Sequence, residues 1–211
     1  LYANEWLMSL KTFKTPLRYP GGKSRACKKM EPFFPDLRDY DVYYEPFLGG
    51  GSVALHITKK YPKLKIVVND LYEPLYNFWL QLQVNGDYVH DQLQQLKSRF
   101  PDRGSARGLF LDAKEKLYDL DITDKDRAVC FYIINKCSFS GLTESSSFSE
   151  QASDANFSMR GIDKLPVYSK LIEDWYITNV DYHHLLGDKE KTFVYLDPPY
   201  DIKDNLYGKK G

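Results

Sequence analysis

The chain has 211 residues, 43% of them hydrophobic, which is enough for one domain with a real core, or for a domain that carries a small insert. Lysine plus arginine equals aspartate plus glutamate at 29 each, so the bulk charge neither favours nor excludes a nucleic-acid partner. No apolar run is long enough to span a membrane, so we expect no membrane association. The three cysteines and four histidines lack ligand spacing, which predicts no metal site and fits a reducing cytoplasm.

The first third of the chain alternates between strand and helix signals. After a loop with Pro20-Gly21-Gly22, the pattern predicts a short helix near 23–33, a strand at 41–47, a helix at 52–60, a strand at 64–69 and a helix at 73–84. Strands that alternate with helices pair in parallel, so the fold class is α/β with a Rossmann-like sheet.

The middle of the chain interrupts this alternation. Helical patterns at 87–99, 106–120 and 124–136, the last capped by Thr123 or Asp124, are together too long for a crossover. A serine-rich stretch at 137–161 predicts an exposed loop or hairpin. The sheet pattern then returns with a helix near 163–173, a strand at 175–180, a short helix near 181–186 and a strand at 192–197. We therefore divide the chain into a catalytic domain, residues 11–86 and 162–211, and an insert, residues 87–161.

Asp197-Pro198-Pro199-Tyr200 is the most informative motif, because it follows the apolar run 192–196. Ligands of open α/β sheets bind at the carboxyl ends of strands. Asp197 and the Pro198 carbonyl can accept the two hydrogens of an exocyclic amine, and Tyr200 can stack on its base. Pro199 holds the preceding carbonyl in a stiff frame. The motif predicts methylation of a base amine; the plainer alternative is a strand followed by a proline turn.

Gly49-x-Gly51-x-x-Ala54 follows the first strand, and Asp70 ends the next one, about twenty residues later. Glycines in this position let a ligand approach the backbone, and the acid receives a ribose. Enzymes that bind NAD and enzymes that bind S-adenosylmethionine (SAM) share this scheme, because both ligands carry adenosine.

Residues around the glycines favour SAM over NAD. Glu45, followed by Pro46 and Phe47, can hold the cationic amino group of a methionine moiety and would repel a pyrophosphate. Lys23, directly after Gly22, can meet the carboxylate of SAM while Tyr19 packs on the cofactor.

Residues 11–29 hold seven basic side chains and no acid. Such a segment can track DNA phosphates although the whole chain is neutral, or it can be a solvated basic terminus. For phosphate contact we expect the following five residues: Lys11, Lys14, Arg18, Lys28 and Lys29.

Four motifs in a fixed order resemble the Dam-like family (D12 class, alpha group) of DNA adenine-N6 methyltransferases. They are Leu17-Arg18-Tyr19-Pro20-Gly21-Gly22-Lys23, Tyr44-Glu45-Pro46-Phe47-Leu48-Gly49-Gly50-Gly51-Ser52-Val53, Val68-Asn69-Asp70 and Asp197-Pro198-Pro199-Tyr200. The resemblance implies that Tyr19, Lys23, Asp70 and Asp197 touch SAM and that residues 197–200 hold a flipped adenine. It also implies a seven-stranded sheet, with further strands and helices after Tyr200, so that the catalytic domain is incomplete here.

The segments 131–142 and 157–161 resemble the start and the end of the family's DNA-probing hairpin. Phe139 is either a wedge for the gap left by the base or a core contact at a helix end. The candidates for reading base edges are Ser140, Thr143, Glu144, Asn156 and Arg160. Relatives that read GATC carry Tyr-Asn and then Arg where this chain has Phe139-Ser140 and then Glu144, so GATC is not implied.

Together these patterns predict a SAM-dependent enzyme that methylates the N6 amine of adenine in double-stranded DNA, in the cytoplasm of a bacterium or a phage-infected cell. Cytosine-N4 methylation is an alternative, since that amine meets the same acceptors. A DNA-binding regulator that has lost turnover, and an NAD dehydrogenase, are rivals of other classes. The recognition sequence, a partner nuclease and the oligomeric state cannot be predicted.

Overall fold

The strands form one parallel sheet. The computed structural model describes residues 14–19, 22–24, 26–141, 146–184 and 190–199. The strands within these residues are β1 (Val42–Glu45), β2 (Lys65–Asn69), β3 (Tyr176–Thr178) and β4 (Thr192–Val194), in the order β3-β2-β1-β4. Every pairing is parallel, which confirms the predicted α/β class. In the described part of the chain the sheet has four strands, against the seven that the resemblance implied.

Helical elements connect the strands and cover the sheet. Those around β1 are α2 (Cys27–Met30), the 3-10 turns η1 (Glu31–Phe33) and η2 (Leu37–Asp39), and α3 (Ser52–Lys60). The helix predicted near 23–33 is therefore shorter and continues as a 3-10 turn. Tyr43, Ile66 and Val68 point from the sheet into the core and are almost fully buried. Another 3-10 turn, η4 (Tyr182–His184), follows β3.

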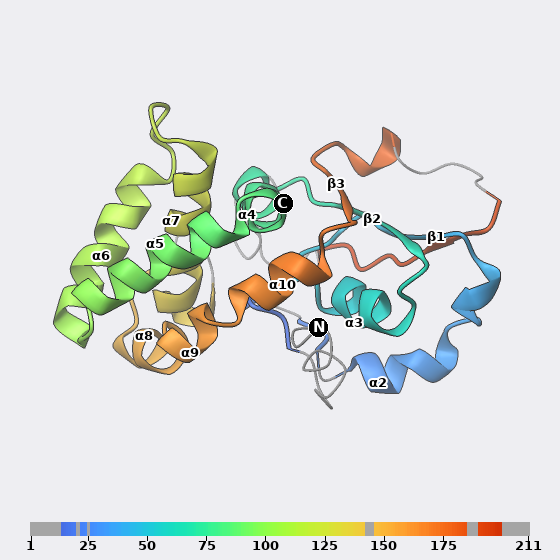
Figure 1. Cartoon of the computed structure of the whole chain (residues 1–211), viewed down its shortest axis with the longest axis horizontal. Coiled ribbons are helices and arrows are strands. Elements are labelled where there is room, and N and C mark those ends of the chain that lie inside the picture. The colour runs from blue at the N-terminus through green and yellow to red at the C-terminus, as the bar shows by residue number, and fades with distance from the viewer. Residues whose placement is uncertain (1–13, 20–21, 25, 142–145, 185–189, 200–211) are drawn as a thin grey trace.

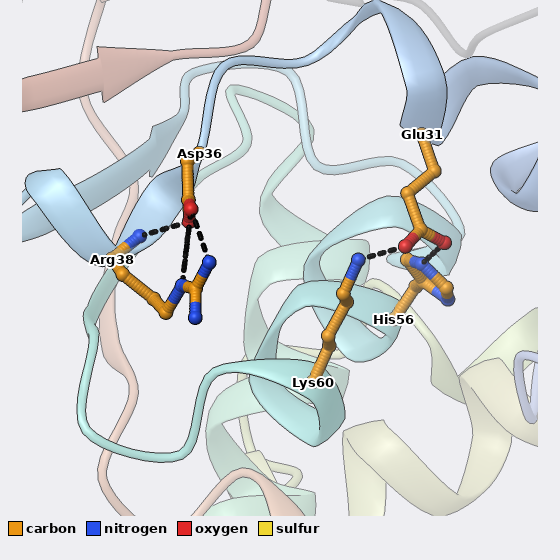
Figure 2. A network of polar contacts seen from close by, with 5 residues as sticks. All are labelled: Glu31, Asp36, Arg38, His56 and Lys60. Carbon is orange, nitrogen blue, oxygen red and sulfur yellow. Dashed lines mark hydrogen bonds and ion pairs between the residues drawn. The ribbon is translucent and has the colours of Figure 1, made fainter.

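A polar network fastens the segment before β1 to α3 (Figure 2). Glu31 of η1 meets His56 at 3.2 Å and pairs with Lys60, and both partners lie on α3. Asp36 caps η2 by accepting from the backbone N–H of Arg38 at 3.1 Å and from its guanidinium Nε at 2.9 Å. These contacts fix where the chain enters the sheet.

The other helices form a bundle beside the sheet, with α4 and α10 lying between the two (Figure 1). They are α4 (Glu73–Val84), α5 (Gly86–Arg99), α6 (Arg103–Lys116), α7 (Asp124–Cys137), α8 (Glu150–Asn156), α9 (Met159–Ile162) and α10 (Leu165–Leu171). The bundle contains the predicted insert. Helix α4 precedes the predicted boundary at residue 87 but packs closely on α7 within the insert, so this boundary stays a prediction.

Helix α7 is the centre of the bundle. It packs against α4, α5, α6 and α8, and all its residues from Ala128 to Cys137 are buried. The hydroxyl of Thr123 caps it by accepting from the backbone N–H of Asp126 at 3.3 Å. The Phe78 ring of α4 lies 5.9 Å from the Tyr132 ring of α7 in a stacked arrangement. Burial all round explains why the middle of the helix, residues 128–134, is apolar on every face.

The serine-rich stretch 137–161 is more helical than the sequence predicted. An antiparallel bridge joins Ser138 to Phe148, and η3 (Phe139–Gly141) lies inside it, so the first half is a hairpin-like excursion. The second half contains α8 and α9. Ser149 and Ser158 cap these helices, each accepting a backbone N–H three residues on. Serine favours helix caps as well as turns, and the prediction weighed only the turns.

The segment 14–19 joins the sheet to the bundle. Asn135 of α7 is 1% exposed, and its amide oxygen accepts from the backbone N–H of Arg18 at 2.9 Å. The amide nitrogen donates to the Arg18 carbonyl at 2.6 Å and to a carbonyl of η3 at 3.1 Å. On the sheet side, the hydroxyl of Thr15 donates to the carbonyl of Gly50. Both parts of the molecule therefore hold this segment.

Replacing Asn135 tests how much this joint stabilises the fold. Asn135→Ala leaves buried backbone groups unpaired, so we expect the free energy of unfolding to fall by about 2–4 kcal/mol in urea titrations. The control is Asn156→Ala, whose amide makes one bond within its own helix, to Ala152 at 2.8 Å. In this control variant we expect the free energy of unfolding to fall by about 0.5–1.5 kcal/mol. Equal losses in the two variants would contradict a special role for Asn135.

Candidate active site

The glycine loop between β1 and α3 depends on glycine at two positions. Gly49 and Gly51 have φ angles of 50° and 67°, in the left-handed region. A Cβ atom at Gly49 would lie 2.7 Å from the ring of Tyr19, and one at Gly51 would lie 2.8 Å from the ring of Trp79. The Trp79 indole N–H donates to the Gly49 carbonyl at 3.1 Å. The loop is therefore held between two aromatic rings.

Asp70 ties this loop to the end of β2. Its carboxylate accepts from the backbone N–H of Gly49 at 2.8 Å and from that of Tyr72 at 3.0 Å. Burial raises the pKa of Asp70 to about 6, while these two hydrogen bonds oppose the rise. The sequence predicted Asp70 as a ribose acceptor. In the structure both of its oxygens also order the protein's own backbone.

Asp197 follows β4 and is held by Lys23. The Lys23 ammonium lies 2.7 Å from the Asp197 carboxylate, and the two side chains are 23% and 27% exposed. Two residues predicted to bind ligand are thus brought together although they are far apart in the sequence. Pro198 and Pro199 are exposed beside them, and Tyr200 lies outside the described residues.

Glu45 is the most deeply buried acid of the site, at 3% exposure. Burial, together with the nearby charges of Asp197 and Asp70, raises its pKa to about 8. A hydrogen bond from the Tyr43 hydroxyl, at 2.7 Å, works in the opposite direction. Glu45 is therefore largely protonated at neutral pH in the free protein.

Three carboxyl groups gather at one edge of the sheet, because β1, β2 and β4 are parallel and each ends next to one of them. Glu45 ends β1, while Asp70 and Asp197 follow β2 and β4. Lys23 is the cation paired within this group. An edge with this charge distribution favours a ligand with positive charge and one carboxylate over a pyrophosphate.

Two further predicted cofactor residues have structural partners. The Phe47 ring packs on the Tyr182 ring with centroids 5.1 Å apart, just beyond β1. Gly22 donates its backbone N–H to the Tyr19 carbonyl at 3.1 Å, which closes the turn before Lys23. Both residues thus shape the edge where the carboxyl groups lie, and their contact with a cofactor stays a prediction.

Comparison with known proteins gives a consistent picture. Residues 19–210 match the family of D12 class N6 adenine-specific DNA methyltransferases. The chain belongs to this family. It is 26% identical over 212 residues to the type II methyltransferase M.MjaIII of Methanocaldococcus jannaschii, a match that covers 92% of this chain and 70% of that protein. It is 24% identical over 218 residues to the modification methylase StsI of Streptococcus sanguinis, covering 95% of this chain but 31% of that protein.

Membership in the D12 class makes this an adenine-specific DNA methyltransferase, which confirms the sequence-based family assignment. The enzyme acts on DNA and requires a methyl donor. No helix in the described ranges is both long and apolar enough to cross a membrane. Within the same residues, no group of three or more histidine, cysteine or acidic side chains is arranged to hold a metal ion.

The residues predicted to touch DNA are spread over the methyltransferase. Phe139 is 68% exposed, so it is not the core contact that was the alternative interpretation. Ser140 lies in η3, and Asn156 bonds within α8. Arg160 is exposed on α9. Thr143, Glu144 and Lys11 lie outside the described residues.

The described residues of the predicted basic segment lie on two structural elements. Lys14 and Arg18 belong to the segment that is joined to α7, whereas Lys28 and Lys29 lie on α2, at the far end of the sheet from the bundle (Figure 1). Phosphate contact by Lys14 and Arg18 is compatible with this arrangement. For Lys28 and Lys29 phosphate contact stays a prediction.

Sequence reasoning missed three residues that shape this site. Asn135 positions the segment before the Tyr19 ring, Trp79 supports the glycine loop, and Tyr43 donates to Glu45. Only Asn135 could have been recognised from the sequence, because it is a polar residue that directly follows four apolar ones in a predicted helix. The other two were counted as ordinary core residues.

The raised pKa of Glu45 implies that the free energy of unfolding depends on pH. The group has its ordinary pKa of 4.5 in the unfolded chain and about 8 in the folded one, so between these values the folded state holds a proton that the unfolded state has lost. Stability therefore falls as the pH rises through this window, by at most about 1.4 kcal/mol per pH unit.

Glu45→Gln should flatten this slope, measured as the free energy of unfolding in urea between about pH 6 and 8. Asp70 contributes with the same sign below its own pKa of about 6, and His56, whose pKa burial lowers, contributes with the opposite sign near pH 6, so the difference between the wild type and the variant isolates Glu45. The control is Glu115→Gln, an exposed glutamate on α6. If the wild type and Glu45→Gln had the same slope, Glu45 would already be ionised in the folded protein.

Proposed function

We propose that the carboxyl edge of the sheet binds SAM and directs its methyl group to the N6 amine of adenine in double-stranded DNA. The observation that carries the proposal is the gathering of Glu45, Asp70 and Asp197 around the glycine loop, with Lys23 beside them. SAM supplies a methyl group on a cationic sulfonium and also carries an ammonium and a carboxylate. NAD would place a pyrophosphate among three carboxyl groups, which argues against a dehydrogenase.

We assign the contacts with the cofactor to different residues along this edge of the sheet. Glu45 holds the cationic amino group, and Lys23 pairs with the cofactor carboxylate. Asp70 receives the ribose with the lone pairs that its backbone hydrogen bonds leave free. Gly49 and Gly51 let the ligand approach the backbone, and Tyr19 packs against it.

The target adenine leaves the DNA stack and enters the pocket at Asp197. Asp197 and the carbonyl of Pro198 would accept hydrogen bonds from the two N6 hydrogens, which would localise the nitrogen lone pair for attack on the methyl group. As the bond from N6 to the methyl carbon forms, the bond from that carbon to the sulfonium sulfur would break. S-adenosylhomocysteine would then leave, and the extra N6 proton would pass to solvent. Pro199 keeps this carbonyl in place, and Tyr200 stacks on the base. Catalysis then consists of positioning and electrostatic stabilisation by preorganised groups. The enzyme acts in the cytoplasm, where bacterial and phage DNA lie.

The hairpin between Ser138 and Phe148 reads the DNA. We assign its exposed ring, Phe139, to the space that the flipped base leaves, and Ser140, Thr143 and Glu144 follow it in the sequence. Asn156 and Arg160 come from α8 and α9, which follow the hairpin. Cytosine-N4 methylation offers the same amine chemistry and is separated by analysing the methylated product.

Removing the acceptor at the reacting centre tests the chemistry. Asp197→Ala should lower methyl transfer from labelled SAM to a defined duplex by about 10²–10³, because N6 loses a preorganised partner. The matched control is Asp112→Ala, which also removes an aspartate paired with a lysine, at 2.9 Å, but on α6. The control should retain wild-type turnover.

The wild-type product must be N6-methyladenine when the modified DNA is digested and its nucleosides are separated. Near-normal turnover in Asp197→Ala, or N4-methylcytosine as the product, would overturn the proposed mechanism. SAM binding should be measured alongside by calorimetry with NAD as a comparison, since tight NAD binding without SAM binding would overturn the cofactor assignment.

Exchanging the hairpin tests recognition. Replacing residues 140–144 should change which sequence is methylated, since base edges are read by few side chains and each good contact discriminates by about 1–3 kcal/mol. SAM affinity should stay unchanged, because the glycine loop is untouched. Sequencing of the methylated sites gives the answer. An unchanged methylation pattern would reject the hairpin and make the helical segment 87–123 the next candidate.

A further inference from the structure

Trp79 of α4 is a buried tryptophan whose polar group is bonded to the glycine loop. Its side chain is fully buried, and its indole N–H donates to the Gly49 carbonyl at 3.1 Å. The indole ring also fills the space beside Gly51, because a Cβ atom there would lie 2.8 Å from it. Core packing explains most buried tryptophans, whose N–H bonds to whatever acceptor is near. Here the acceptor belongs to the loop that we assign to the cofactor.

The backbone of Gly49 is held at both of its polar groups. Its N–H donates to the Asp70 carboxylate at 2.8 Å, and its carbonyl accepts from Trp79. Asp70 follows β2 and Trp79 lies on α4, so the loop is tied to two elements that flank it. Gly49 is buried, and a buried backbone group that loses its partner costs free energy. The two bonds therefore favour this one conformation of the loop.

The loop needs such ties because of its glycines. Gly49 and Gly51 have φ angles of 50° and 67°, and glycine has access to more backbone conformations than any other residue. A loop that samples several conformations must be ordered when a ligand binds, and this ordering lowers the affinity. A loop that is already ordered binds the same ligand more tightly. The hydrogen bond from Trp79 thus bears on ligand affinity as well as on stability.

We propose that the indole N–H of Trp79 is a positioning group for SAM, which holds the Gly49 carbonyl and so keeps the glycine loop in its binding conformation. The inference rests on the proposed function, because it takes SAM as the ligand of this loop. Trp79 acts through the loop and makes no contact with the cofactor or with DNA. Its loss should therefore change the affinity for SAM and leave the chemical step and the affinity for DNA unchanged.

Trp175 provides a matched control for Trp79. It is 5% exposed, and its ring centroid lies 5.7 Å from that of Trp79. Its indole N–H donates at 2.8 Å to the hydroxyl of Thr58 on α3. That hydroxyl donates in turn to the Ala54 carbonyl within the same helix, at 2.7 Å. A change to phenylalanine removes one indole N–H and the same ring volume at either position, but only Trp79 is bonded to the loop.

The test compares Trp79→Phe and Trp175→Phe with the wild type, all as the whole chain. SAM binding is measured by calorimetry, and kcat and the KM values for SAM and DNA are measured in methyl transfer to a defined duplex. Trp79→Phe should weaken SAM binding about three- to tenfold, as expected for one neutral hydrogen bond, and should raise the KM for SAM. Its kcat at saturating SAM and its KM for DNA should stay near the wild type. Trp175→Phe should match the wild type in all these measurements.

A second variant separates the N–H from the ring. Benzothienylalanine, incorporated in place of Trp79, keeps the shape of the two fused rings but carries sulfur where the indole has its N–H. It should weaken SAM binding as much as Trp79→Phe does, with a smaller loss of stability in urea titrations because no cavity forms. This variant also gives the comparison if Trp79→Phe fails to fold.

Three results would overturn the proposal. They are wild-type SAM affinity in the folded Trp79 variants, an equal loss of SAM affinity in Trp79→Phe and Trp175→Phe, and full affinity in the benzothienylalanine variant, which would assign the effect to ring packing. In each case a wild type that binds SAM and methylates adenine leaves the proposed function intact. A wild type that does not bind SAM rejects the proposed function itself.

Discussion

The hydrogen bonds between the Arg18 backbone and the Asn135 side chain hold the sheet and the helical bundle in one arrangement. An extended segment has no secondary structure to satisfy its own N–H and carbonyl groups, and an amide inside an apolar helix has no water. The Arg18 backbone and the Asn135 side chain therefore satisfy each other's hydrogen-bonding groups. From this joint the chain continues to Tyr19, which covers the glycine loop, and to Lys23, which meets Asp197. The geometry of the cofactor edge thus depends on a residue of the bundle.

The electrostatics of the cofactor edge oppose stability in the free protein. Burial raises the pKa values of Glu45 and Asp70 to about 8 and about 6, and at Glu45 the charges of Asp197 and Asp70 contribute to the rise. The hydroxyl of Tyr43 and the backbone N–H of Gly49 reduce the penalty without removing it. Groups with pKa values displaced in this direction are typical of functional sites rather than of structural ones. A cationic ligand would relieve the repulsion on binding.

The sequence predicted local features well and long-range partners poorly. The helices α3 and α4 begin and end where glycine, proline and apolar spacing placed them, because these signals act over a few residues. The strand starts were predicted to within one residue, but only β2 ends where the sequence placed its end, whereas β1, β3 and β4 end two or three residues earlier. That Asp70 would hold Gly49, or that Trp79 would donate to the same loop, depends on contacts between residues far apart in the chain. The hydrophobic periodicity of the sequence gives no information about such contacts.

The basic segment shows the same limit. In the sequence, Lys14, Arg18, Lys28 and Lys29 are near neighbours, but the turn at Gly22 sends the last two to α2. Proximity in sequence therefore did not show that these residues belong to two structural elements.

Arg18 and Asn135 are separated by 117 positions, which has a consequence for the order of assembly. On the ribosome, the first strands and the glycine loop emerge long before α7 has been synthesised. Until then the segment that carries Tyr19 has no partner on the bundle side, and the loop lacks the fixed cover that it has in the native state. Non-local contacts of this kind form late and slowly. A segment that is synthesised long before α7 is therefore among the last parts to become ordered.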